Sequence, residues 1–274
     1  MMHDNVLFWL LLVAHLLNDF YFQNEKMAEE KLKKPKVFLA HNVIYALCSG
    51  VLLFLFIGLP LALTVTLLIA ATHCGIDCIK FFREQKKVKI LAKQDDDAKK
   101  AEITEKFDLK STRIFVIDQC LHVAIISIIA YICAINNWIA LNSVGSWLIS
   151  TYNNLQIGVS PKDFLKLFFV GLIIWRPANI LIRELNKKQY ADNDDENKNQ
   201  YKNAGKIIGT IERILVVVMI LLNQYASIGL IFTAKTITRY NKISEEPAFA
   251  EYYLVGTLLS VLIAILSVVF VNMI

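Results

Sequence analysis

Long apolar runs separated by short polar segments extend along most of the chain. A helix needs about 20 apolar residues to cross ~30 Å of hydrocarbon, and seven of the runs approach that length. An eighth run, at 226–238, is shorter and suits a re-entrant or tilted helix. We therefore predict an all-α fold, a polytopic transmembrane helix bundle with spans at 5–22, 38–57, 59–82, 113–134, 164–182, 206–224 and 252–273.

Other fold classes fit the pattern poorly. The runs lack the alternation of apolar and polar residues that marks the strands of a membrane barrel, and only helices or closed barrels pair their backbone groups in lipid. The composition agrees, since 56% of the 274 residues are hydrophobic and the mean hydropathy is +0.48. The first run has neither a basic segment before it nor a small-residue cleavage site after it, so we expect a retained helix.

Turn and composition signals divide the chain into three parts. Gly58-Leu59-Pro60 predicts a tight turn, which makes the second and third spans an antiparallel hairpin. The stretch 138–149 contains Trp138 and Trp147 and suits an interfacial helix, with an irregular loop as the alternative. We expect a four-helix membrane module at 1–134, an uncharged outer segment at 135–163 and C-terminal membrane helices at 164–274.

Charged residues are concentrated in three segments between the runs. The loops 23–37, 83–113 and 183–206 carry five, ten and six basic residues, whereas 134–161 has no charged residue. The positive-inside rule makes the basic loops cytoplasmic and the N-terminus external, as in a bacterial inner membrane. The net charge of +5 is therefore a topology signal, and no nucleic-acid partner is expected. The segments 84–110 and 186–204 within the second and third of these loops are expected to be mobile connections.

Ionisable residues occur inside the first four predicted spans, where they are costly unless they are paired. Three histidine and aspartate pairs have a spacing of four residues, which brings both side chains to one face of a helix. These pairs are His15 with Asp19, His73 with Asp77, and His122 with Asp118, and His41 lies alone in the second span. Counted from the basic loops, all seven residues lie within ~15 Å of the cytoplasmic boundary.

A divalent metal ion would balance such a layer. Zinc accepts histidine and carboxylate ligands, and manganese or iron can take the same set. We predict that the metal ligands are His15, Asp19, His41, His73, Asp77, Asp118 and His122. The alternative role for some of the aspartates is to orient a ligating histidine, and Asp19, Asp77 and Asp118 are also the candidate catalytic carboxylates. The alternatives are a proton or cation pathway, or polar contacts that only hold the helices together.

Four stretches resemble a membrane family of bacteria catalogued as domain of unknown function 3307. They are HLLNDFYFQ from His15, HNVIYAL from His41, HCGIDCIK from His73 and DQCLH from Asp118. The resemblance covers the first half of the chain best, and the segments 224–235 and 251–260 are similar to longer members. The family name implies no activity.

Basic residues of the second half are candidates for binding an anionic group. Arg176, in Trp175-Arg176-Pro177, and Arg213 fall at the inner ends of their predicted spans, and guanidinium groups match phosphate or carboxylate oxygens. Snorkelling of these side chains to the lipid headgroups is the alternative. With Gln23 and Gln119 as hydrogen-bonding neighbours of the His/Asp layer, they complete the predicted substrate-binding set.

The sequence leads to three functional hypotheses. The first is a membrane-embedded metal-dependent enzyme, a hydrolase of a lipid-linked or membrane-proximal substrate at the cytoplasmic leaflet. The second is a cation or proton transporter or channel that uses the same residues. The third is a structural or regulatory membrane partner, with assembly into a homo-oligomer left open. No dinucleotide fingerprint, P-loop, G-x-S-x-G or H-E-x-x-H motif is present.

Overall fold

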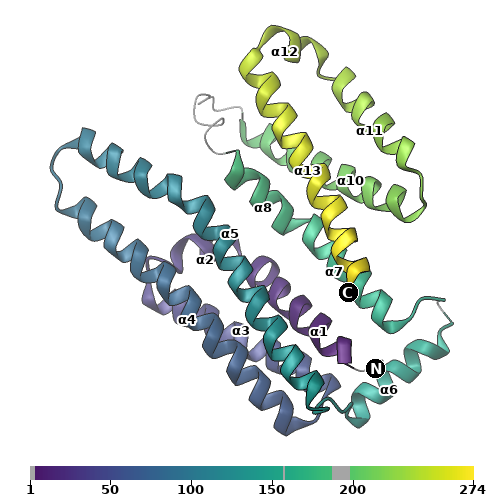
Figure 1. The fold of residues 1–274 in the computed structure, drawn as a ribbon. Coiled ribbons are helices and arrows are strands. Elements are labelled where there is room, and N and C mark those ends of the chain that lie inside the picture. The colour runs from purple at the N-terminus through teal and green to yellow at the C-terminus, as the bar shows by residue number, and fades with distance from the viewer. Residues whose placement is uncertain (1–3, 157, 187–197) are drawn as a thin grey trace. The chain divides into compact units, whose positions relative to one another are not determined.

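The computed structural model describes residues 4–156, 158–186 and 198–274, and the chain forms two compact units, Met1–Lys166 and Leu167–Ile274. Every regular element in the described residues is a helix, apart from an isolated bridge between Ile57 and Leu141. The predicted all-α fold is therefore confirmed. Each unit is described by itself below (Figure 1).

The first unit is built from helices that surround a short N-terminal one. Helix α1 packs against both α3 and α5, and α3, α4 and α5 pack in sequence, so that α1 has the most enclosed position. Figure 1 shows α4 and α5 as a long antiparallel pair that extends beyond α1 and α3. The elements are α1 (Asp4–Leu16), the π-helix η1 (Leu17–Phe22), α2 (Glu25–Glu30), α3 (Pro35–Phe56), α4 (Leu59–Ala92), α5 (Asp97–Ile135) and α6 (Ser143–Asn154).

The turn between α3 and α4 is as predicted, with α3 ending at Phe56 and α4 beginning at Leu59. Asn142 fastens this turn to α6. Its side-chain amide donates to the carbonyl groups of Phe54 and Ile57 at 2.6 and 3.0 Å, and its Oδ1 accepts the N–H of Gly145 at 2.7 Å as the N-cap of α6. Because Asn142 sets the start of α6, the helix predicted over 138–149 lies at Ser143–Asn154 and excludes Trp138.

The predicted mobile connection at 84–110 is mostly helical. Helix α4 continues to Ala92 and α5 begins at Asp97, and the Asp96 carboxylate caps α5 by accepting the N–H of Ala98 at 2.9 Å. The segment is rich in Lys, Glu and Ala, which are strong helix formers, so a polar helix fits its composition better than an irregular loop. Most of the other expected connection, 187–197, lies outside the described residues.

The second unit contains a helix broken in the middle. Helix α7 (Pro161–Ile174), which begins in the first unit, ends before Trp175, and α8 (Arg176–Leu185) begins after it with Pro177 in its first turn. This interruption agrees with the kink that the proline predicts. Helix α13 packs along α10, α8 and α12. The other elements are α10 (Lys198–Leu221), α11 (Tyr225–Ile237), α12 (Tyr240–Glu245) and α13 (Pro247–Met273).

Five helices in the described part are long and apolar enough to cross a membrane, and these are the helices expected of an integral membrane protein. They lie at Pro35–Phe56, Leu59–Ala92, Thr112–Ile135, Pro161–Leu185 and Pro247–Met273, with shorter apolar helices at Val6–Phe22 and Tyr225–Ile237. The span predicted at 206–224 falls on α10, whose apolar face is interrupted by Lys206, Glu212 and Arg213. The predicted spans at 5–22 and 206–224 are therefore not among the five long apolar helices.

Candidate metal centre

The four histidines and three aspartates predicted as a layer lie together in the core of the first unit. Each of the seven side chains is buried, and Asp19, the most accessible, is 8% exposed. The rings of His15 and His122 have centroids 4.9 Å apart, and those of His73 and His122 lie 4.6 Å apart. Residues from α1, η1, α3, α4 and α5 therefore form one buried cluster, which we call the His/Asp cluster.

The π-helix η1 delivers Asp19 to this cluster. Three consecutive side chains of η1 are buried, namely Asn18, Asp19 and Phe20. The Asn18 amide donates to the carbonyl of Ala14 at 2.8 Å, the group that a regular α-helix would bond to the backbone N–H of residue 18. It also donates to the Ser49 hydroxyl on α3 at 3.1 Å. Short π segments often occur at functional sites, and this one brings a carboxylate into the core.

Asp19 contacts histidines of other helices. Its Oδ1 lies 3.0 Å from Nε2 of His73 and 3.4 Å from Nε2 of His41. His122 Nδ1 donates to the backbone carbonyl of Asp118 at 2.8 Å, and the same nitrogen is 3.6 Å from the Asp118 carboxylate. The four-residue spacing thus places the histidine and the aspartate of each pair near each other along one helix. The closest contacts of Asp19, however, are with histidines of other helices.

Two lysines, the buried Lys31 and the partly buried Lys80, belong to the cluster and were missed by the sequence analysis. Lys31 follows α2, and its Nζ lies 3.0 Å from Oδ2 of Asp77 and 3.2 Å from Nε2 of His41. Lys80 on α4 bridges two aspartates, with its Nζ 2.5 Å from Oδ1 of Asp77 and 2.9 Å from Oδ2 of Asp118. Three carboxylates facing two ammonium groups leave one formal negative charge on the cluster when the histidines are neutral.

The hydrogen bonds indicate which imidazole nitrogens carry lone pairs. Because His122 Nδ1 donates to a carbonyl, its Nε2 is the lone-pair nitrogen, and this atom is buried without a hydrogen-bond partner in the described residues. His73 uses Nε2 toward Asp19, and its Nδ1 is likewise buried and unpaired. Buried polar atoms without partners are uncommon, and here they mark a place for an ion or a water molecule.

Three groups of side chains have ligand atoms close enough to share an ion, all within 4.8 Å of one another. Lys31 contacts His41 and Asp77 of one group, and Lys80 bridges the two carboxylates of another. No lysine or arginine of the described residues lies within ion-pair distance of the remaining group. The three groups are His15, Asp19 and His73; His41, His73 and Asp77; and Asp77, Asp118 and His122.

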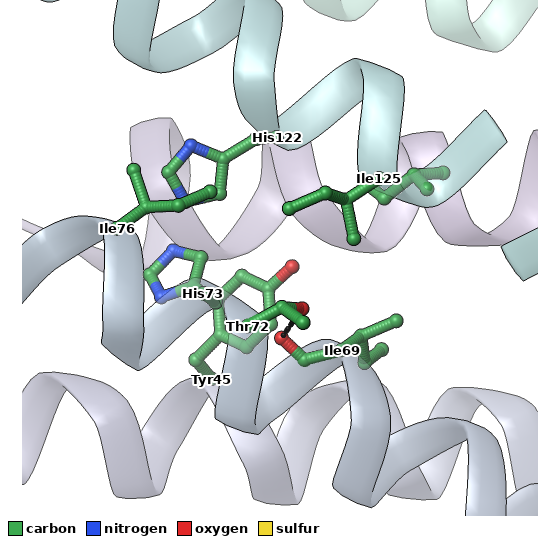
Figure 2. A pocket seen from close by; sticks show the side chains of 8 residues that line it. Tyr45, Ile69, Thr72, His73, Ile76, His122 and Ile125 are labelled. Atoms are coloured by element: carbon green, nitrogen blue, oxygen red, sulfur yellow. Dashed lines mark hydrogen bonds between the residues drawn. The ribbon is translucent and has the colours of Figure 1, made fainter. Parts of the chain in front are cut away.

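A cavity of about 10 Å³ adjoins the two histidines that carry unpaired nitrogens. That volume is room for roughly one water molecule. Figure 2 shows His122 reaching from α5 toward His73 on α4, with the Tyr45 ring beside His73 and isoleucines around them. The Tyr45 ring stacks on His73 with centroids 3.7 Å apart, and its hydroxyl lies 3.4 Å from Nδ1 of His15.

The two predicted glutamines of the substrate-binding set lie in the first unit. Gln119 bridges two cluster residues, since its amide donates to Oδ2 of Asp118 at 3.0 Å and its Oε1 lies 3.3 Å from Nε2 of His15. Gln23 is partly buried at the end of η1. Gln119 is thus in direct contact with the cluster.

The predicted arginines belong to the second unit. Arg176 is exposed at the start of α8, whereas Arg213 is 1% exposed. The Arg213 guanidinium donates to the Ile174 carbonyl at 2.6 Å and to Asn179 Oδ1 at 2.6 Å. It also donates to Ser260 at 3.0 Å and Thr210 at 3.2 Å. These bonds join α10 to the end of α7, to α8 and to α13, an arrangement that suits a structural role.

Comparison with known proteins gives a family and no activity. A family model described as "Protein of unknown function (DUF3307)" matches residues 7–149. No curated protein and no solved structure matches the chain. The matched range contains every residue of the His/Asp cluster together with Lys31 and Lys80. The match covers more than half of the chain, and the protein belongs to this family of unknown function, DUF3307.

Proposed function

We propose that the protein is a membrane-embedded metal-dependent enzyme, a hydrolase whose divalent ion is held by His15, Asp19 and His73. The observation that carries the proposal is that this group, alone among the three described ion groups, has no lysine of the described residues bound to it. Asp19 Oδ1 and His73 Nε2 lie 3.0 Å apart, and a bound ion would take the place of the proton in this hydrogen bond. Ligand atoms of a tetrahedral zinc site stand roughly 3.3 Å apart, given metal–ligand distances of about 2.0–2.2 Å. Zinc is therefore our first choice, with manganese or iron as alternatives.

The charge of the cluster supports an ion with a positive charge. One formal negative charge remains after the two lysines are counted. An unbalanced buried charge in a membrane is costly, and a bound divalent ion together with a single anionic ligand would make the cluster neutral. Asp77 and Asp118, predicted as ligands or bases, are held by lysines and in this proposal balance charge.

A hydrolytic role is supported by the small cavity beside the candidate ligands. A bound divalent ion would polarise a carbonyl or phosphoryl oxygen and lower the pKa of a water molecule to near neutrality. The cavity lined by His73 and His122 has room for roughly one water molecule close to such an ion. We propose a lipid-linked or membrane-proximal substrate at the cytoplasmic leaflet of a bacterial inner membrane, the side toward which the basic segments point.

A transport function has one observation in its favour and one against it. Hydrogen bonds and ion pairs connect Tyr45 through His15, Gln119, Asp118, Lys80, Asp77 and Lys31 to His41, which forms a continuous polar chain across the cluster. The chain does not extend toward the turn between α3 and α4. In the described residues beyond Ser49, the buried side chains there are apolar, namely Leu53, Ile57, Ala62, Val65, Ile69, Ile126, Ala130 and Cys133.

Metal content tests the proposal directly. Wild-type protein purified in detergent and dialysed against trace zinc should hold about one equivalent of zinc, manganese or iron by elemental mass spectrometry. A variant with His15→Ala and His73→Ala should lose the ion because two of its three ligands are removed. His122→Gln serves as the matched control, since it changes a buried histidine of the same cluster outside the proposed group, and it should retain the ion.

Activity is the second stage of the test. Metal-loaded wild type should hydrolyse a member of a panel of phospholipids and lipid-linked phosphate esters in mixed micelles, and the double variant should not. A wild type that stays metal-free after zinc loading would sink the enzyme proposal. Proton flux in liposomes would then decide whether the hydrogen-bonded chain serves transport.

A further inference from the structure

Lys31 has an unusual position for a lysine in a basic connecting segment. The other described lysines of this segment that flank it, Lys33 and Lys34, are exposed, whereas Lys31 is 6% exposed. It follows the six-residue helix α2, and its backbone N–H is bonded to the carbonyl of Met27 at 2.9 Å. Burying an ammonium group costs several kcal/mol unless partners compensate it, so the partners of Lys31 determine what it does there.

Those partners are the atoms that would ligate a metal ion. The Lys31 ammonium contacts the Asp77 carboxylate at 3.0 Å and Nε2 of His41 at 3.2 Å, and these two atoms are themselves 3.6 Å apart. An ammonium group has only donors, so His41 Nε2 accepts this hydrogen bond through its lone pair. A lone-pair imidazole nitrogen and a carboxylate oxygen are also the preferred ligands of zinc. His41 and Asp77 complete an ion group with His73.

The chain segment that carries Lys31 is fastened to the membrane helix beside it. The side-chain amide of Gln85 on α4 donates to the backbone carbonyl groups of Leu32 and Lys33 at 3.1 and 3.0 Å. These two bonds fix the residues immediately after Lys31. The backbone next to Lys31 is therefore held in place by α4, which favours the observed position of the ammonium group.

We propose that the Lys31 ammonium is a built-in cation that fills a second metal subsite formed by His41 and Asp77, next to the His73 that the first ion uses. The wild-type protein accordingly holds a single divalent ion, and removal of the lysine charge opens the subsite to a second one. The count in the wild type rests on the proposed function, whereas the gain of an ion on removing Lys31 does not. The second subsite takes a divalent cation that accepts histidine and carboxylate ligands, with zinc as the probe.

Metal stoichiometry measures this directly. Lys31→Met keeps an unbranched side chain that is one atom shorter and removes its charge, while Asp77 retains its ion pair with Lys80. After equilibration with zinc and desalting, we expect one more equivalent of zinc per chain in Lys31→Met than in the wild type. Lys33→Met is the matched control, because it removes an exposed lysine from the same segment, and it should equal the wild type.

A second substitution distinguishes the subsite from adventitious binding. Adding Asp77→Asn to Lys31→Met removes the carboxylate ligand, and the extra equivalent should disappear. Gln85→Ala tests the same subsite without changing the charge of the cluster. Because this variant frees the segment that carries Lys31, the ammonium group should compete less strongly with zinc. Gln85→Ala should take up a second zinc at a concentration at which the wild type takes up one, and it also serves if Lys31→Met is not monodisperse.

The outcomes separate this inference from the proposed function. If both Lys31→Met and Gln85→Ala bind as much zinc as the wild type, Lys31 does not occupy an ion subsite and the inference is overturned. If the wild type binds no zinc and Lys31→Met binds one equivalent, the inference stands and the metalloenzyme proposal fails. A gain that persists after Asp77→Asn also overturns the inference, because the ion then lies elsewhere.

Discussion

At the scale of single residues, the orientation of the imidazole rings in the cluster depends on their hydrogen-bond partners. His15 has a partner on each ring nitrogen, Gln119 on one side and the Tyr45 hydroxyl on the other. A hydroxyl can donate to a bare nitrogen or accept from a protonated one, so Tyr45 can stabilise either tautomer of His15. When a histidine ligates a metal, the partner of its other nitrogen orients the ring and strengthens the ligand.

Tyr45→Phe is expected to weaken zinc binding. The substitution keeps the ring that stacks on His73 and removes the hydroxyl beside His15. Loss of such an orienting partner typically lowers metal affinity by about 10-fold to 100-fold, and we expect the lower end because the contact is long. Competition with a chromogenic zinc chelator measures the change.

The matched control for this prediction is Tyr131→Phe. Tyr131 lies on α5 with 66% of its surface exposed, so the same atom is removed away from the cluster. Its affinity for zinc should equal that of the wild type. An unchanged affinity in Tyr45→Phe would show that its hydroxyl does not position His15 for the ion.

The residues of the cluster were predictable to different degrees. The histidines and aspartates stand out because ionisable groups inside apolar runs are rare and costly. Lys80 could have been predicted as a member of the cluster, because it follows Asp77 by three residues and shares its helix face. Lys31 had no such signal. It is one of five lysines in its segment, and its burial depends on contacts with α3 and α4 that are distant in sequence.

At the scale of helices, breaks and close approaches need specific side chains. The break between α7 and α8 leaves the Ile174 carbonyl at a helix end, where a cation is favoured by the helix dipole. Arg213 supplies that cation, and no carboxylate in the described part of the chain lies within ion-pair distance of it. The proline predicted the break, but the partner of the broken end lies on another helix and could not be read from the local sequence.

Arg213→Met should destabilise the second unit. The change leaves a buried acceptor on Ile174 and a partly buried one on Asn179 without their donor, and an unsatisfied buried group costs about 1–3 kcal/mol. We expect a loss on the order of 3 kcal/mol in the free energy of unfolding. Thermal unfolding in detergent measures this loss. Arg176→Met, at an exposed position of α8, should change the free energy of unfolding by less than about 0.5 kcal/mol. Equal effects of the two substitutions would refute the structural role of Arg213.

Gly145 marks the closest approach of α6 to the end of α3. A Cβ atom at this position would lie 2.6 Å from the carbonyl oxygen of Phe56 and 2.9 Å from its Cα. Because both are backbone atoms, Gly145→Ala must push the helices apart, at a cost of about 1–3 kcal/mol in unfolding free energy. Gly171→Ala on α7 meets nothing within 4 Å and should be neutral or stabilising. Thermal unfolding of the two variants side by side tests the contact. An unfolding free energy of Gly145→Ala equal to that of the wild type would disprove it.

At the scale of the whole molecule, the residues matched by the family model all lie within the first compact unit. The match ends at residue 149, and the first unit ends at Lys166, so the complete His/Asp cluster belongs to the part that defines the family. The long apolar helices of this part were predictable from length and composition alone. The helical state of 84–110 was missed because its polar composition was interpreted as a loop, although its residues favour a helix.

A fragment comprising residues 1–166 should therefore fold and bind zinc without the remainder of the chain. All ligands and both lysines lie within it, and its helices pack on one another. We expect the fragment to elute as a single species in detergent and to hold as much zinc as the intact protein. A fragment that is monodisperse but metal-free would mean that the second unit contributes to the ion site.

The π-helix η1 has a consequence for comparing relatives of this protein. A π turn accommodates one residue more than an α turn, so it is equivalent to a one-residue insertion that has been kept. Deleting one residue of η1 before Asp19, such as Leu17, would restore α-helical spacing and rotate Asp19 by about 100° relative to α1. In an alignment of the family, a gap at this point would then identify members whose carboxylate no longer reaches His73.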